Sequence, residues 1–176
     1  MRKSAYKLLL ISALVMLAVQ LWAADNILGL WKTVDDETGK PRSYVMIYMY
    51  QGKVYGRIVA LISETTGELE DSLEIKKFKA DKYVGDPYTC GLDFLYELVD
   101  KGKEWKGSIT DPKDGKVYDC SVKRDGNKLI VRGSLRGTGG LLGRNQTWHK
   151  AEPSELPFKL PDPASFIPSV PTPKKK

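Results

Sequence analysis

The sequence predicts an all-β fold, a small up-and-down barrel or meander followed by a proline-rich extension. Three observations predict it. Turn signals that contain glycine recur at short intervals, at residues 36–40, 51–53, 101–103, 114–116 and 125–127. The runs between them are rich in β-branched and aromatic residues, which favour strands. Apolar and polar side chains also alternate along several of these runs, a period typical of strands with one buried face. Hairpin after hairpin is the pattern of an antiparallel up-and-down architecture.

The first 24 residues have the three parts of a secretory signal peptide. Three basic residues among the first seven precede an apolar run over residues 8–19, and small residues follow. Cleavage is expected after Ala23 or Ala24. The apolar run is 12 residues long, against the ~20 needed to span a bilayer. We therefore expect a periplasmic or secreted protein with no transmembrane span in the mature chain.

Eight strands are expected in the mature domain, residues 25–150. One example of the alternation is Tyr118, Cys120 and Val122, which are separated by Asp119 and Ser121. A length of about 125 residues is sufficient for one hydrophobic core. The expected strands are residues 29–34, 43–51, 54–61, 92–99, 104–110, 117–123, 128–135 and 145–149.

One segment breaks the strand pattern. Between residues 68 and 80, Leu69 and Leu73 lie four apart among good helix formers, and Asp86-Pro87 follows. This spacing predicts a short helix on or across the barrel.

The last segment, residues 151–176, contains seven of the ten prolines and ends in three lysines. Such a tail is expected to be extended and polyproline-like. The expected strand 43–51 is apolar on both faces, and one face presents the tyrosine stripe: Tyr44, Met46, Tyr48 and Tyr50. Apolar residues between 156 and 170 could cover this stripe. The alternative is a disordered tail whose lysines lie near anionic envelope surfaces.

Charge argues against a nucleic-acid partner. The formal net charge is +6, but residues 25–150 carry 21 basic and 19 acidic side chains. The folded part is therefore nearly neutral, whereas nucleic-acid-binding domains are strongly basic.

The only two cysteines are Cys90 and Cys120. In an exported chain a disulfide between them is the default expectation. The alternative is a pair of buried free thiols, because disulfide geometry is demanding.

Several motifs together resemble a family of exported bacterial proteins, domain-of-unknown-function family 2147. They are, in order, residues 29–33 (GLWKT), 38–43 (TGKPRS), 52–59 (GKVYGRIV), 105–107 (WKG), 115–118 (GKVY) and 142–148 (LGRNQTW). The resemblance implies a lipocalin-like (calycin) barrel and no settled activity. It also implies that Trp31 lies at the closed end of the barrel with Arg144 stacked over its indole.

No residue set reads as an active site, a metal site or a cofactor site. His149 is the only histidine and stands at the end of an expected strand. The carboxylates of Asp35, Asp36 and Glu37 lie in a turn without the spacing of a calcium loop. We therefore expect neither a cofactor nor an enzyme, although a carboxylate-based hydrolase is not excluded.

The leading hypothesis is a non-enzymatic envelope protein that binds a small apolar ligand or lipid inside the barrel. The alternative is an interaction or structural protein that uses the tyrosine stripe or the tail to contact an envelope partner. The residues expected to line the barrel are Val45, Ile47, Ile58, Leu92, Phe94, Tyr118, Leu129 and Val131.

Overall fold

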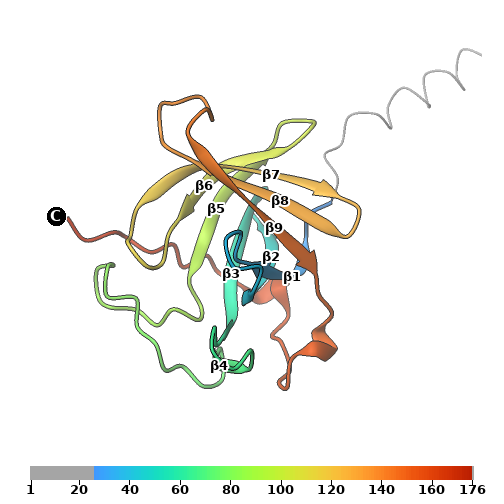
Figure 1. The fold of residues 1–176 in the computed structure, drawn as a ribbon, viewed down its shortest axis with the longest axis vertical. Helices are drawn as coiled ribbons and strands as arrows, with labels where there is room; N and C mark the ends of the chain where they lie inside the picture. Colours follow the sequence, from blue (N-terminus) through green and yellow to red (C-terminus); the bar gives the residue numbers. More distant parts are fainter. Residues whose placement is uncertain (1–25, 176) are drawn as a thin grey trace, which may run out of the picture.

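The computed structural model describes residues 26–175 and shows an eight-stranded antiparallel barrel (Figure 1). The expected signal peptide lies outside the described residues. Adjacent strands pair in the order β2-β1-β9-β8-β7-β6-β5-β3, and pairing between β2 and β3 closes the barrel. The short strand β4 extends the free edge of β3. The strands are β1 (Gly29–Val34), β2 (Pro41–Tyr50), β3 (Lys53–Ile62), β4 (Leu69–Ser72), β5 (Asp93–Asp100), β6 (Trp105–Thr110), β7 (Val117–Asp125), β8 (Lys128–Ser134) and β9 (Gly143–Lys150).

The eight expected strands are confirmed, and no boundary differs from expectation by more than two residues. Tight turns with glycine at positive φ join neighbouring strands, as at Gly52 (φ 77°) and Gly126 (φ 56°), where a side chain would be strained. Within residues 26–175, no helix is long and apolar enough to cross a lipid bilayer.

The short helix expected over residues 68–80 is wrong. The segment begins with β4, in which Leu69 pairs with Ile62 of β3, and continues as a loop. The buried carboxylate of Asp71 accepts hydrogen bonds from the backbone N–H groups of Lys77 (3.1 Å) and Phe78 (2.9 Å). Because an aspartate can supply such local alternatives to helical hydrogen bonds, it overrides the helix propensity of its neighbours.

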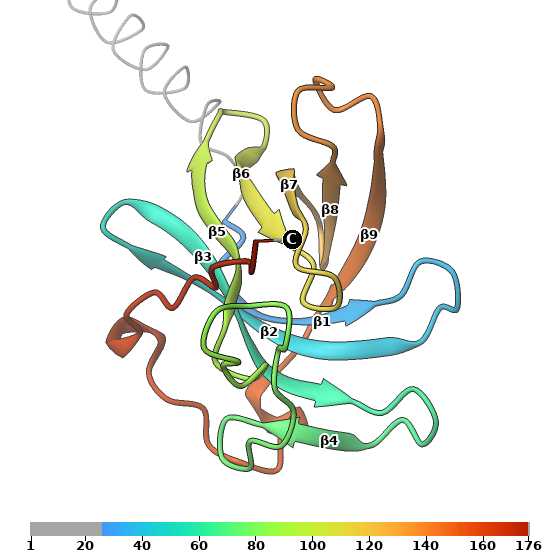
Figure 2. The same cartoon turned by 90° about the vertical axis from the view of Figure 1, so that its left-hand side faces the viewer.

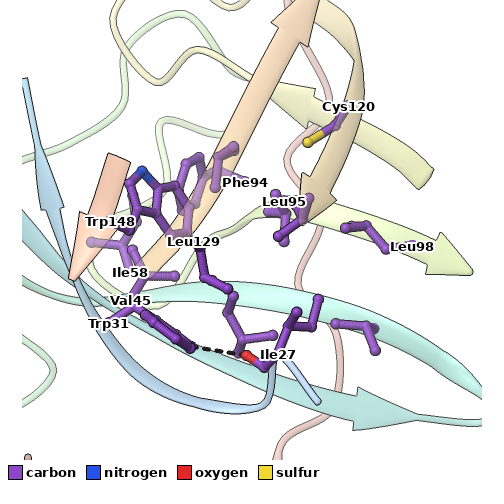
Figure 3. Close-up of a cluster of buried hydrophobic side chains, with 14 of the residues drawn as sticks. Ile27, Trp31, Val45, Ile58, Phe94, Leu95, Leu98, Cys120, Leu129 and Trp148 are labelled. Atoms are coloured by element: carbon purple, nitrogen blue, oxygen red, sulfur yellow. Dashed lines mark hydrogen bonds between the residues drawn. The ribbon is translucent and has the colours of Figure 1, made fainter. Parts of the chain in front are cut away.

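Buried apolar side chains form two large clusters, one on each side of the barrel wall. We call the first the interior core; it includes Trp31, Val45, Phe94, Leu129 and Trp148 (Figure 3). The second is the outer cluster. Its barrel residues are Leu30, Tyr44, Met46, Tyr48, Tyr55, Val59, Ala60 and Ile62, and its tail residues are Ala151, Leu156 and Phe166.

The tail therefore packs on the tyrosine stripe, which confirms the first of the two expectations for it. It leaves the end of β9, forms two short 3-10 turns, η2 (Pro153–Glu155) and η3 (Pro163–Ser165), and ends on the opposite side of the barrel (Figure 1). Leu156 and Phe166 are 7% and 6% exposed. The two apolar faces of β2 thus have distinct partners, because one faces the interior core and the other faces the tail.

The expected disulfide is wrong for this structure, because Cys90 and Cys120 are both buried free thiols. The Cys90 thiol lies near the carboxylate of Asp71 and the backbone of Leu61. Cys120 lies in the middle of β7, between Gly107 of β6 and Gly133 of β8. Burial, followed by the charge of Asp71, raises the pKa of Cys90 to about 12. Burial also raises the pKa of Cys120.

Both thiols should resist alkylation in the folded protein and react after unfolding without any reductant. The raised pKa values leave almost no thiolate at neutral pH, and the thiolate is the nucleophile. Intact mass after treatment with iodoacetamide, in buffer and in denaturant, measures the two states. A denatured, non-reduced sample that takes up no alkyl groups would show that the pair is bonded and would contradict the structure.

Candidate ligand-binding site

Trp31 of β1 is part of the interior core. Its indole is fully buried and donates a hydrogen bond to the Ile27 carbonyl at 2.8 Å (Figure 3). Two cations cover the ring: Lys150 Nζ lies 5.2 Å and the Arg124 guanidinium carbon 5.9 Å from its centroid. Such cation–π contacts stabilise the ring by about 0.5–2 kcal/mol each.

The cation expected over Trp31, Arg144, is elsewhere, and this prediction is wrong. Strand β1 pairs with only the last two residues of β9, and Trp31 lies opposite Lys150 there. Arg144 stands near the start of β9, towards the other end of the barrel, and is exposed. Its guanidinium pairs with the carboxylates of Asp36 and Glu37. The expected acidic turn is thus confirmed as a turn, although its carboxylates are partly neutralised by an arginine.

The residues expected to line the barrel do not all lie together. Leu92 belongs to a separate small cluster with Ala80 and Tyr83, and Tyr118 is half-buried opposite Ile109. In the interior core, Phe94 stacks on Trp148 with ring centroids 5.9 Å apart. Side chains therefore occupy much of the space around Trp31. The six expected residues that lie in the interior core are Val45, Ile47, Ile58, Phe94, Leu129 and Val131.

A groove of about 670 Å³ lies outside the barrel, between its wall and the tail. We call it the tail groove. The barrel contributes Gly29, Leu30, Met46 and Lys150, and the chain after β9 contributes residues 151–154 and 158–163. Its lining is mainly aliphatic, aromatic and proline side chains, with two cations, Lys150 and Lys159, and two carboxylates, Glu152 and Asp162.

The first support of the groove is the turn η2. Glu155 forms an ion pair with Lys32 of β1 and accepts a hydrogen bond from the Tyr44 hydroxyl at 3.1 Å. The ammonium of Lys32 is the first cause of a lowered pKa for Glu155. Leu156, the next residue, is buried in the outer cluster. This end of the tail is therefore held by one ion pair and one apolar side chain.

The second support is a buried ionic cluster under residues 166–169. Arg57 of β3 makes a bidentate pair with Asp93 of β5, at 2.7 and 3.2 Å, and Asp93 is fully buried. The same guanidinium donates to the Ile167 carbonyl at 2.6 Å and lies 4.4 Å from the centroid of the Phe166 ring. Burial and the charge of Asp93 raise the pKa of Tyr48, whose hydroxyl donates to that carboxylate.

The tail also completes the hydrogen bonding of Asp93. The Asp93 amide donates to the Ser169 carbonyl at 3.0 Å, and the Ser169 amide donates to the Asp93 carboxylate at 2.6 Å. The tail is therefore held at two places, at Glu155 and Leu156 and at residues 166–169. Residues 158–163, which lie between them, form one wall of the groove.

A smaller pocket of about 250 Å³ lies beside the groove, under β4. Its walls include Leu69, Ile75, Lys77 and Pro157. Phe158 lines both this pocket and the tail groove. The two cavities are thus neighbours separated by one aromatic side chain.

Sequence reasoning found the tyrosine stripe but missed the ionic cluster. Asp93 stands between Leu92 and Phe94 in an apolar run, where alternation places it on the solvent face. The tail covers that face, so the carboxylate is buried. The one signal available was an acidic residue inside a strongly apolar stretch, since such a residue needs a partner when buried.

Comparison with known proteins matches the chain to a protein family and to a solved structure. DUF2147, described as "Uncharacterized protein conserved in bacteria", matches residues 29–150. A solved structure of protein HP1028 from the human pathogen Helicobacter pylori, described as belonging to the lipocalin family, is similar with a TM-score of 0.58. It is 22% identical, and the similarity covers 74% of this chain and 86% of that one. No curated protein matches this chain.

Proposed function

Since this chain belongs to the bacterial family DUF2147 and folds as a lipocalin-like barrel, we propose that it is a non-enzymatic binding protein for a small apolar ligand. We place the ligand in the tail groove. The signal peptide expected over residues 1–24 supports a role outside the cytoplasm, in the periplasm or beyond it.

The observation that carries the proposal is the groove itself. Its volume of about 670 Å³ lies within the ~300–1,000 Å³ typical of small-molecule sites. Leu30, Met46, Phe158 and Leu160 offer apolar contact. Lys150 and Lys159 offer cations for an acidic head group, beside the carboxylates of Glu152 and Asp162. A fatty acid or a similar amphiphile has this combination of an apolar chain and one acidic group.

The barrel interior is the second candidate location. Val45, Ile47 and Val131 belong to the interior core, where they pack with the two indoles of Trp31 and Trp148. A small barrel can be filled by its own side chains. Tyr118 and Ile109 are half-buried and are the candidate contacts of a ligand at this second location. The experiment below distinguishes the two locations.

Titration with a fluorescent long-chain fatty acid should show saturable binding to the mature protein. Leu160→Asp should weaken binding at least tenfold, because it places a carboxylate in the apolar wall of the groove. Leu141→Asp is the matched control, since Leu141 is 85% exposed in a loop and does not line the groove. Native mass spectrometry of protein isolated from its own envelope fraction should show a co-purified ligand and a chain that begins at residue 24 or 25.

Each outcome of this titration has a separate meaning. Loss of binding in Tyr118→Asp but not in Leu160→Asp would show that the ligand binds inside the barrel and would contradict the proposal that it binds in the tail groove. No saturable binding at all would end the ligand proposal. The interaction-protein alternative would then be favoured.

A further inference from the structure

A loop beside β4 exposes large apolar side chains to water. Ile75 is 63% and Phe78 is 45% exposed, and Tyr88 on the neighbouring segment is 43% exposed. Figure 2 shows this part of the chain, in green between β4 and β5, in front of the barrel strands, and Figure 1 shows it extending to one side of them. Exposed apolar groups that gather in this way commonly mark an interaction surface.

Hydrogen bonds to buried residues of β4 hold the loop in this conformation. The Asp71 carboxylate, only 3% exposed as a residue, binds the amides of Lys77 and Phe78, and the Ser72 hydroxyl accepts from the Ile75 amide at 3.1 Å. The Phe78 carbonyl accepts from the Thr89 amide at 2.9 Å. Because the backbone is fixed on both sides, Ile75 and Phe78 are presented outward by the fold itself.

Three lysines are interleaved with these apolar residues. The sequence reads Ile75-Lys76-Lys77-Phe78-Lys79, and all three lysines are exposed. None of the ion pairs found within residues 26–175 involves them. Lys76 and Lys79 instead lie over the Tyr88 ring, at 6.0 and 5.6 Å from its centroid. Residues 75–79 therefore combine three positive charges with exposed apolar surface, between the exposed carboxylates of Glu74 and Asp81.

We propose that this basic loop, residues 75–79 with Tyr88, binds the surface of an anionic lipid bilayer. Ile75 and Phe78 enter the boundary between head groups and acyl chains, and the lysines contact lipid phosphates. Interleaved basic and apolar residues suit such an interface. A protein partner fits less well, because lysine is depleted in protein–protein interfaces.

The basic loop lies close to the groove proposed for the ligand. Ile75 and Lys77 line the small pocket whose opposite wall is Phe158, and Phe158 also lines the tail groove. A bilayer bound at the loop would therefore lie near one end of the groove. The membrane proposal does not depend on the ligand, because binding to vesicles is measured without one.

The test is co-sedimentation of the mature protein with vesicles. Vesicles of phosphatidylethanolamine with phosphatidylglycerol should bind the protein, in a manner weakened by salt, and vesicles of phosphatidylcholine alone should not. Each lysine near an anionic surface strengthens binding roughly fivefold. The triple variant Lys76→Gln, Lys77→Gln, Lys79→Gln should therefore lose affinity on the order of a hundredfold.

The matched control is Lys101→Gln, Lys103→Gln, Lys123→Gln, which removes the same charge from exposed positions on other loops and strands. An equal loss in the two triple variants would show general electrostatic attraction and overturn the proposal. So would an absence of binding to the anionic vesicles. As a second readout, Phe78→Trp should show a blue-shifted emission on anionic vesicles, and an unshifted spectrum of the bound protein would also overturn it.

Discussion

Replacement of Trp31 by alanine should destabilise the domain by about 3–5 kcal/mol, the range for a large buried aromatic residue. The indole is fully buried in the interior core and contacts two cations. Its removal leaves a cavity and deprives the buried Ile27 carbonyl of its donor. Urea unfolding followed by far-UV circular dichroism measures the change in the free energy of unfolding.

Double-mutant cycles would identify which arginine is energetically coupled to Trp31. Arg124→Ala should be non-additive with Trp31→Ala, because the two side chains are in contact. Arg144→Ala should change the free energy of unfolding very little, because its ion pairs are exposed, and its effect should add to that of Trp31→Ala. Measurable coupling between Trp31 and Arg144 would contradict the structure.

Truncation after Ala151 should lower the melting temperature by on the order of 10 °C, which is about 3 kcal/mol for a domain of this size. Leu156 and Phe166 are buried by the contact, and a buried side chain of this kind contributes about 1.5–3 kcal/mol. The prolines reduce the opposing entropy, because their φ angles are restricted before the tail docks. The tyrosines of the stripe should also become accessible to acrylamide, which tyrosine fluorescence would report.

Two point variants test the same contact without truncation. Phe166→Ala should reproduce much of the loss, because this ring packs on Tyr48 and Arg57. Ile167→Ala should have almost no effect, since Ile167 is 72% exposed. Equal melting temperatures for the full and truncated chains would mean that the tail does not contribute to the stability of the fold.

The docked tail changes how the tyrosine stripe can act. Tyr44, Met46 and Tyr48 are each less than 10% exposed. A partner protein that used the stripe would first have to displace Leu156 and Phe166. The stripe is therefore internal surface in this chain, whereas Ile75 and Phe78 on the loop at residues 75–79 are exposed.

Local sequence patterns were sufficient for the strands but not for the segment after β3. Alternation along residues 117–123 and glycine in each turn specify strands and hairpins through short-range sterics. The stretch from Leu69 to Ala80 carries a helical spacing of two leucines. Its conformation is decided by the buried carboxylate of Asp71, and burial depends on elements distant in sequence.

The sequence by itself determined the all-β class, the eight barrel strands to within two residues and the need to cover the second apolar face of β2. Each depends on interactions between residues close in the chain or on the composition of one strand. Only the tertiary structure decided that Arg124 and Lys150 cover Trp31, that Arg57 and Asp93 hold the tail, and that a groove lies beneath it. These contacts join residues up to 119 positions apart, as for Trp31 and Lys150, and they depend on strand register and on the path of the tail. Neither can be obtained from the spacing of residues within a segment.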